Sequence, residues 1–250
     1  MSHRHICVHG HFYQPPRENP WTGEVEREES VSPFHDWNAR IADECYGPMT
    51  LGVRAGSDGR TIAYDETLKR ISFNFGPTLL SWLESERPSI LARVLAADGA
   101  TQTAIASPYF HALLPLESRR DKETLVRWGL AEFRHRYKRE ASGLWPPETA
   151  ADDETLEVLA AAGLAFTILD PEQAAAARSI DGGDWADVHA SPIDPKTPYL
   201  WTSPKDPTKK LAVFFYHRRL SHGVVTGETV ASATGFADAV RYLASVVPPA

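Results

Sequence analysis

Short segments of strand-like apolar residues alternate along the chain with longer segments in which apolar residues recur every three or four positions. The predicted strands cover residues 6–8, 71–75, 104–106, 144–145, 166–169 and 211–216. The predicted helices cover residues 79–95, 122–137, 153–160 and 229–246. This alternation of periods is typical of an α/β fold with parallel strands.

Polar residues mark the starts of helices and the loops. Asp121 precedes the second predicted helix, and either Asp152 or Asp153 precedes the third, so we expect them as N-caps. A polar, Pro-rich loop is predicted over 10–33, and an excursion rich in Gly, Asp and Pro over 179–207. Polar and aromatic clusters come directly after the predicted strands, where α/β folds build their sites.

Composition narrows the class of protein. Apolar residues make up 42% of the 250 residues and charged residues 24%, so a normal core forms and the chain is not compositionally disordered. The net charge of −7 argues against a nucleic acid or an anionic membrane as partner. Cys7 and Cys45 are too few for a disulfide framework. Without a signal peptide or a membrane-spanning run, we expect a cytoplasmic protein.

The first cluster of chemically capable residues contains His9 and His11, which follow the first predicted strand. Because side chains alternate along an extended chain, both imidazoles leave it on the same side. Three roles remain open for them: metal ligation, hydrogen bonding to sugar hydroxyls, and burial with satisfied hydrogen bonds. A metal site needs a third and usually a fourth ligand, which weighs against the first role.

Two further clusters follow the middle strands. His111 lies in a loop after 104–106, where a packed loop with one polar side chain is the better interpretation of this cluster taken alone. Glu148 follows Trp145 and two prolines at a strand end. This position suits a nucleophile or an acid as much as a carboxylate that interacts with the dipole of the next helix. Trp145 offers a flat apolar face on which sugar rings stack.

The last cluster ends the strand at 211–216. His217 comes directly after this strand, and Arg218 and Arg219 follow it. We interpret the two arginines as surface cations.

Together these clusters resemble glycoside hydrolase family 57, and most closely its bacterial subgroup whose chains open His-Gly-His-Phe-Tyr-Gln-Pro-Pro-Arg-Glu-Asn-Pro-Trp. The sequence carries this opening intact from His9 to Trp21. Other stretches that resemble the subgroup are 35–38, 44–46, 71–82 and 119–124. The resemblance covers nearly the whole chain.

The resemblance implies an incomplete, seven-stranded parallel (β/α) barrel of the glycoside hydrolase/deacetylase type. It predicts a single domain over 1–250 that lacks the last barrel elements at its C-terminal end. Because an unclosed barrel exposes apolar strand edges, we also expect either a partner chain, such as a second copy in a homo-oligomer, or poor solubility.

The resemblance also implies an enzyme that acts on α-linked glucans with retention of configuration, by hydrolysis or glucan transfer. Glu148 is then the nucleophile. The residues expected to bind substrate are His9, His11, Gln14, Trp21, His111 and Trp145. No cofactor and no metal are expected, and the expected partner is an α-glucan or oligosaccharide, not a nucleic acid or a membrane.

One position departs from the family pattern. The family's acid/base is an Asp at the end of a strand that reads Phe-Phe-Tyr-Asp in the subgroup, and His217 stands there in this chain. A retaining mechanism uses two carboxyl groups about 5–5.5 Å apart. Histidine transfers protons near neutral pH. The proton donor is therefore expected to be His217, or a carboxylate of the 184–206 segment such as Asp194.

Two other functions remain open. A catalytically impaired carbohydrate-binding or regulatory homologue would explain the histidine at position 217. A metal-dependent deacetylase of a related barrel type would use the histidines at 9, 11, 111, 217 and 222. This third interpretation ranks last, because the sequence lacks a strand-end Asp-Asp pair followed by a His-x-x-x-His segment.

Overall fold

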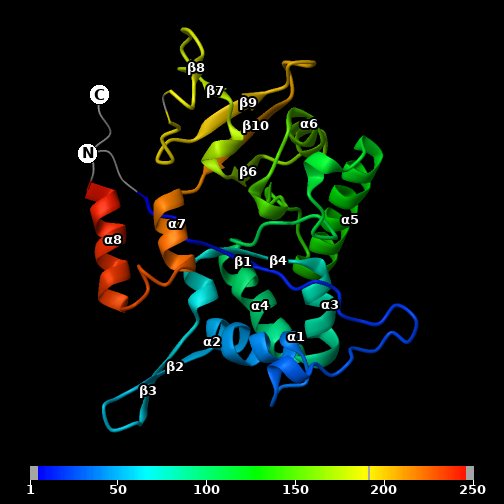
Figure 1. Ribbon diagram of the computed structural model, residues 1–250, viewed down its shortest axis with the longest axis vertical. Helices are drawn as coiled ribbons and strands as arrows, with labels where there is room; N and C mark the ends of the chain where they lie inside the picture. Colours follow the sequence, from blue (N-terminus) through cyan, green and yellow to red (C-terminus); the bar gives the residue numbers. More distant parts are fainter. Residues whose placement is uncertain (1–4, 191, 246–250) are drawn as a thin grey trace.

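Parallel strands form the centre of the α/β fold that the computed structural model describes for residues 5–190 and 192–245 (Figure 1). The paired segments, in spatial order, are β1 (His9–Phe12), β4 (Ser72–Phe75), residues 104–106, β5 (Gly143–Leu144), β6 (Phe166–Leu169) and β10 (Lys210–Phe215). Residues 104–106 connect the two parts through isolated bridges from Ala104 to Phe73 and from Ala106 to Leu144. All the carboxyl ends of these segments therefore lie along one edge.

Helices make the crossovers between the parallel segments. The crossover helices are α3 (Pro77–Glu86), α4 (Pro88–Thr101), α5 (Arg119–Tyr137) and α6 (Asp153–Ala161). The remaining helices are α1 (Trp37–Ile41), a π-helical turn (Ala42–Tyr46), α2 (Gly47–Thr50), α7 (Arg218–Val225) and α8 (Ala233–Ser245). Short 3-10 turns are η1 (Glu29–Val31), η3 (Thr67–Arg70), η4 (Leu114–Leu116), η5 (Pro147–Thr149) and η6 (Pro171–Gln173). No helix of the described residues is both long and apolar enough for a membrane span.

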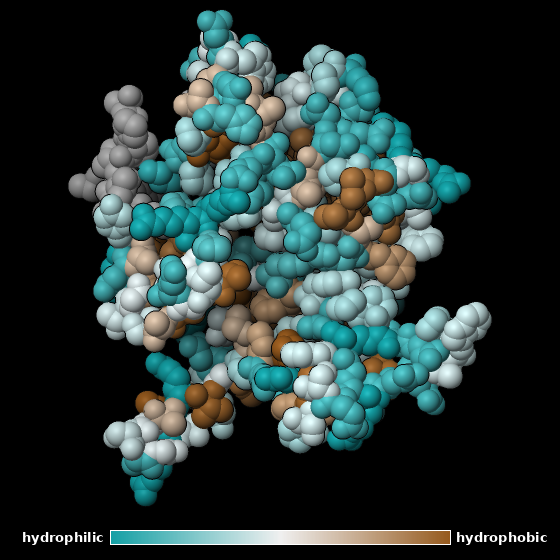
Figure 2. Space-filling view, in the orientation of Figure 1, coloured by the Kyte–Doolittle hydropathy of each residue, from teal (hydrophilic) through white to brown (hydrophobic). Residues whose placement is uncertain are grey.

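Antiparallel elements are added to this framework. β9 (Tyr199–Thr202) pairs with β10, while β2 (Gly52–Ala55) pairs with β3 (Thr61–Asp65) and β7 (Ala176–Ala177) with β8 (Ala186–Asp187). The β2–β3 hairpin projects from the body, and Figure 2 shows brown hydrophobic residues on it. Ile62 is 68% exposed and Tyr64 is 66% exposed. Sequence analysis predicted none of these three pairings, because each strand is short and mostly exposed.

The predicted strands agree with the structure at 71–75, 166–169 and 211–216, to within one residue at each end. The predicted strand at 6–8 is wrong: these residues lie outside any strand, and Ile6 and Val8 are exposed. The strand is β1, four residues that include two histidines. The strand forms there because His9 lies opposite Ser72 in the parallel pairing with β4. The imidazole of His9 also forms a hydrogen bond with the Ser72 hydroxyl.

Two helix starts were tested by the structure. Asp152 caps α6 as expected, its carboxylate accepting from the backbone N–H of Thr155. The expected cap at Asp121 is wrong, since α5 begins at Arg119, two residues before Asp121. Ser118 caps it, accepting from the N–H of Asp121 and donating its hydroxyl to the Asp121 carboxylate at 2.6 Å. The last predicted helix begins at Ala233, and its predicted end at Val246 lies outside the described residues.

The core lies between the parallel segments and α3 to α6. Its fully buried side chains include Leu79, Leu83, Phe73, Val94, Leu144 and Leu159. Gly129 lets α5 approach the chain after 104–106 closely, because a Cβ there would lie 2.1 Å from the carbonyl oxygen of Ser107. A larger residue at this position would push α5 away from the strand end that leads to His111.

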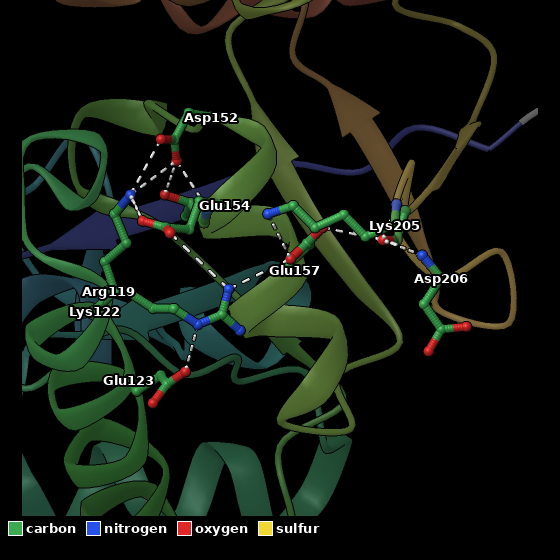
Figure 3. Close-up of polar contacts among 10 residues, drawn as sticks. Arg119, Lys122, Glu123, Asp152, Glu154, Glu157, Lys205 and Asp206 are labelled. Atoms are coloured by element: carbon green, nitrogen blue, oxygen red, sulfur yellow. Dashed lines mark hydrogen bonds and ion pairs between the residues drawn. The ribbon is translucent and has the colours of Figure 1, made fainter.

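A buried lysine holds α5 against the start of α6 (Figure 3). The side chain of Lys122 is 2% exposed, and its Nζ contacts Asp152 at 3.1 Å and Glu154 at 2.9 Å. Burial lowers the pKa of Lys122, but hydrogen bonds to Glu154 and Asp152 outweigh this and raise it. Lys122 is therefore a cation at neutral pH. Since Asp152 lies four residues after Glu148, the contact also fixes where the chain leaves that residue.

A second layer of charges connects the same helices to the loop before β10. Arg119 contacts Glu123 at 2.9 Å and Glu157 at 3.4 Å. Glu157 is buried, and it accepts from the Ser203 hydroxyl at 3.1 Å and pairs with Lys205 at 3.5 Å. These contacts, drawn in Figure 3, join α5, α6 and residues 203–205. The 119–124 stretch thus has a structural role on the outside of the strands.

We predict that Lys122→Met lowers the free energy of unfolding by about 1–3 kcal/mol, because it leaves two carboxylates without their cation. The loss stays below that of a fully buried pair, since Asp152 and Glu154 are partly exposed. Urea unfolding followed by circular dichroism measures it. The matched control is Arg120→Met on the same helix, where the side chain is 88% exposed and the change should stay within about 0.5 kcal/mol. Equal effects of the two substitutions would contradict the prediction.

Candidate functional site

Aromatic rings from three strand ends stack at the carboxyl edge of the parallel segments. The rings of His9 and His11 lie parallel to Trp145, with centroids 4.9 and 5.1 Å away. His111 stacks on Tyr13 at 4.0 Å and lies 5.3 Å from His11. The two histidines of β1 therefore leave the strand on one side, as the sequence predicted, and they meet the tryptophan that follows β5.

Hydrogen bonds through Asn74 connect the imidazoles. His9 contacts Ser72 Oγ through Nδ1 at 2.9 Å and Asn74 Oδ1 through Nε2 at 3.0 Å. The amide nitrogen of Asn74 lies 3.0 Å from Nδ1 of His11. Nε2 of His11 lies 3.2 Å from Nε2 of His111. Asn74 is fully buried on β4, and sequence analysis did not single it out.

One assignment of tautomers satisfies every contact of this chain of side chains. Nε2–H of His9 donates to the Asn74 carbonyl, and the Asn74 amide donates to Nδ1 of His11. Nε2–H of His11 then donates to Nε2 of His111. Nδ1–H of His111 is left facing Oε1 of Glu148 at 3.9 Å. This distance is too long for a hydrogen bond, but the Glu148 carboxylate still acts on the His111 imidazole through its charge.

Burial keeps the three imidazoles neutral. It lowers the pKa of His9 to about 4, with the hydrogen bond that His9 donates to Asn74 opposing the shift and the charge of His11 adding to it. Burial likewise lowers the pKa of His11, and that of His111, where the Glu148 carboxylate opposes it. At neutral pH these side chains therefore act as hydrogen-bonding groups that carry no charge.

Glu148 projects from a strained turn after β5. Its side chain is 71% exposed, while that of His111 beside it is 16% exposed. Its φ of 55° and ψ of 17° lie in the left-handed region, and the φ of Thr149 is 52°. Two consecutive non-glycine residues in this region are costly, and such strain is found at functional sites. The prolines at 146 and 147 fix the chain just before the turn.

A tyrosine–aspartate pair lies at the same edge, and sequence analysis missed it. Tyr216, directly after β10, donates its hydroxyl to Oδ2 of Asp170, directly after β6. Burial raises the pKa of Tyr216 to about 12, and Asp170 and the charge of Glu148 add to the shift. Oδ1 of Asp170 accepts from the backbone N–H of Glu172 at 2.8 Å. Both carboxylate oxygens are thus occupied, and the pair joins the ends of two neighbouring strands.

His217 lies one residue beyond Tyr216, at the N-terminus of α7. Its Nδ1 accepts from the backbone N–H of Leu220 at 3.3 Å, so the imidazole acts as the helix N-cap. It also lines a cavity of about 360 Å³, which Glu148 does not line. Asp194, the other expected proton donor, accepts from the backbone N–H of Lys196 at 3.0 Å in a turn. No contact of the described residues joins either group to Glu148.

The remaining expected substrate-binding residues lie outside the ring cluster. Gln14 donates to the Tyr46 hydroxyl at 3.2 Å and accepts from Arg17 at 3.1 Å, which holds it within the loop after β1. Trp21 is 92% exposed in a turn stabilised by Asn19. Their roles in binding stay predictions. In the described part of the chain, no three His, Cys, Asp or Glu side chains come together as a potential metal site.

Comparison with known proteins shows which family the chain matches. The sequence model of glycosyl hydrolase family 57 matches residues 31–225. That span includes β4, β5, β6, β10 and the residues His111, Glu148 and His217. No curated protein sequence matches the chain significantly.

Solved structures share the fold at low sequence identity. The 4-α-glucanotransferase from Thermococcus litoralis has a TM-score of 0.58 at 16% identity, over 87% of this chain and 28% of that one. An exo-type maltose-forming amylase from Pyrococcus sp. ST04 has a TM-score of 0.58 at 15% identity, over 91% and 38%. An α-amylase from Thermotoga maritima has 0.54 at 12% identity, over 93% and 48%. This chain thus spans less than half the length of each.

The neutral imidazole of His9 predicts how stability depends on pH. Its pKa is about 4 in the folded chain and about 6.5 in the unfolded chain, so between these values only the unfolded chain gains the proton. This contribution is present above pH 6.5, and it is lost as the pH falls toward 4, by about 1.4 kcal/mol per pH unit. Urea unfolding at pH 7, 6 and 5 measures it. In His9→Gln the free energy of unfolding should fall less steeply than in the native chain, and parallel slopes would refute the assignment.

Proposed function

Because the chain belongs to glycosyl hydrolase family 57, we propose that it is an enzyme for α-linked glucans that works with retention of configuration and with Glu148 as nucleophile. The substrate class is taken from relatives whose names describe a glucanotransferase and amylases. We further propose that the six parallel segments from β1 to β10 belong to an incomplete seven-stranded (β/α) barrel.

The observation that carries this proposal is the place of Glu148. Its carboxylate is exposed at the carboxyl end of β5, beside a wall of rings formed by Trp145, His11 and His111. Flat apolar rings suit the C–H faces of sugars, and neutral imidazoles suit their hydroxyls. The carboxylate therefore lies where a sugar bound against the rings would present its ring atoms.

The retaining mechanism of the family gives the reaction. Glu148 attacks the anomeric carbon, the bond to the leaving oxygen breaks, and this oxygen takes a proton from His217, the side chain at the family's acid position, as the glycosyl–enzyme ester forms. Water, or the hydroxyl of a second sugar, then attacks the anomeric carbon, gives its proton back to His217 and releases Glu148. Because His11 and His111 are uncharged, neither neutralises the nucleophile by forming an ion pair with it.

A second candidate function is favoured by the contact of His217. Its Nδ1 already accepts from Leu220, so the tautomer with a proton on Nε2 is the one that caps α7. A side chain that caps the helix and carries no carboxyl group is a poor substitute for the second carboxyl group of a retaining mechanism. This favours a homologue that binds carbohydrate and has lost most of its catalytic rate. General acid catalysis contributes about 10²–10⁴-fold, so weak activity is compatible with the same site.

The test compares variants at the two positions with an unactivated maltooligosaccharide as substrate. Glu148→Gln should abolish the activity, by at least about 10³-fold, because the amide cannot form the ester. His217→Asp should raise activity by about 10²-fold or more, because it supplies the missing carboxyl group. Asp is itself a favourable N-cap, so this variant keeps the start of α7.

His217→Asn is the matched control, since Asn caps a helix but provides no acid. Activity that rises equally in His217→Asp and His217→Asn would refute the role of the carboxyl group. Activity that survives in Glu148→Gln would refute the nucleophile. If all variants are inactive while calorimetry still detects maltooligosaccharide binding, the binding homologue is the correct function.

A further inference from the structure

A cavity of about 360 Å³ lies beside the start of α7, and its lining is rich in cations. Residues of η6, residues within 188–189 and 192–195, and the start of α7 surround it. Its volume lies in the lower part of the range for small-molecule sites. Val188 and Ile193 provide apolar wall, and His217 with Arg218 and Arg219 provide the polar side.

The charge of this cavity is opposite to that of the chain. The chain carries a net charge of −7, yet two arginines line the cavity against one carboxylate, Glu172. Guanidinium groups bind carboxylates and phosphates through paired, fork-like hydrogen bonds. The lining therefore suits an anionic group.

The two arginines differ in their contacts. Arg218 already forms an ion pair with Glu172. Among the described residues Arg219 makes no hydrogen bond, ion pair or ring contact, and it is exposed. Glu172 thus already pairs with Arg218, and Arg219 remains available to a ligand.

His217 adds a directed donor to this cation. Since Nδ1 accepts from the backbone of Leu220, the ring proton is on Nε2, on the opposite side of the ring. The N-terminus of α7 contributes a partial positive charge at the same place. Arg219 and the Nε2–H of His217 together can therefore bind one anionic group without help from Arg218.

The cavity also belongs to the functional edge of the fold. It lies after β6 and β10, the strands that follow β5 in the paired order, and Glu148 comes directly after β5. We propose that this cavity binds a carboxylate or phosphate carried by a sugar, so that the chain takes an acidic saccharide. As a statement about the substrate this rests on the proposed function, but the binding itself does not require catalysis.

Calorimetry on the full chain tests the proposal with glucose 6-phosphate, glucuronate and glucose as probes. At least one of the anionic sugars should bind tenfold or more tightly than glucose, and added NaCl should weaken it. Tighter binding of glucose 6-phosphate alone indicates a phosphate ligand, and tighter binding of glucuronate alone indicates a uronate. Equal affinity for all three sugars would overturn the proposal.

Three substitutions assign the binding to this cavity. Arg219→Gln should weaken the anionic sugar by tenfold or more and leave the affinity for maltose and the melting temperature unchanged. Glu172→Gln should strengthen it severalfold, because Arg218 loses its internal partner. Arg120→Gln removes another exposed cation, on α5 and outside the cavity lining, and should change nothing. Anion binding that is equal in Arg219→Gln and Arg120→Gln would overturn the proposal.

Glu148→Gln separates this proposal from the proposed function. It should keep full affinity for the anionic sugar while it loses catalysis. Anion binding in a chain that proves inactive would refute only the proposed enzyme. Turnover of a neutral maltooligosaccharide in a chain that does not prefer anionic sugars would overturn only the acidic-saccharide inference.

Discussion

Parallel pairing between β1 and β4 is the constraint on which the site depends. The register places His9 opposite Ser72 and His11 opposite Asn74, so the donors and acceptors of one strand meet those of the other. A slip of one residue would move both imidazoles to the opposite face, away from Trp145. The bridges through 104–106 carry the same register to β5, and so to Glu148. The backbone hydrogen bonds that hold these strands together therefore also set the positions of the candidate site residues.

The parts of the fold that the sequence predicted are those whose burial leaves a local pattern. β4 alternates apolar and polar residues, whereas β6 and β10 are mostly apolar, and both patterns are visible in a short window. β1 was misplaced because its polar side chains are stabilised by partners more than 60 residues away. The cap of α5 was misplaced because Ser118 and Asp121 bond to each other, and the residue types alone do not order them.

The residues of the candidate site likewise fall into those that the sequence predicted and those that it did not. Residue types together with the family resemblance selected Glu148, Trp145 and the histidines that meet in the structure, although His9 and His11 lie within β1 and not after a strand. The contact of Tyr216 with Asp170 and the capping role of His217 depend on how strand ends lie in space, which no spacing reveals. Gln14 and Trp21 were selected because they lie in the same opening segment, and neighbours in sequence need not share a site.

The left-handed backbone at Glu148 has a consequence for how this lineage evolves. Glycine, and after it asparagine, adopt that conformation at least cost, whereas other residues cost about 1–2 kcal/mol. Without selection on the chemistry, substitutions to Gly or Asn at position 148 would therefore be favoured, because they relieve the cost of this backbone conformation. A carboxylate in such a turn is therefore lost by substitution sooner than one on a helix. A homologue that does not depend on this carboxylate should therefore tolerate Gly or Asn at position 148, with the rest of the fold unchanged.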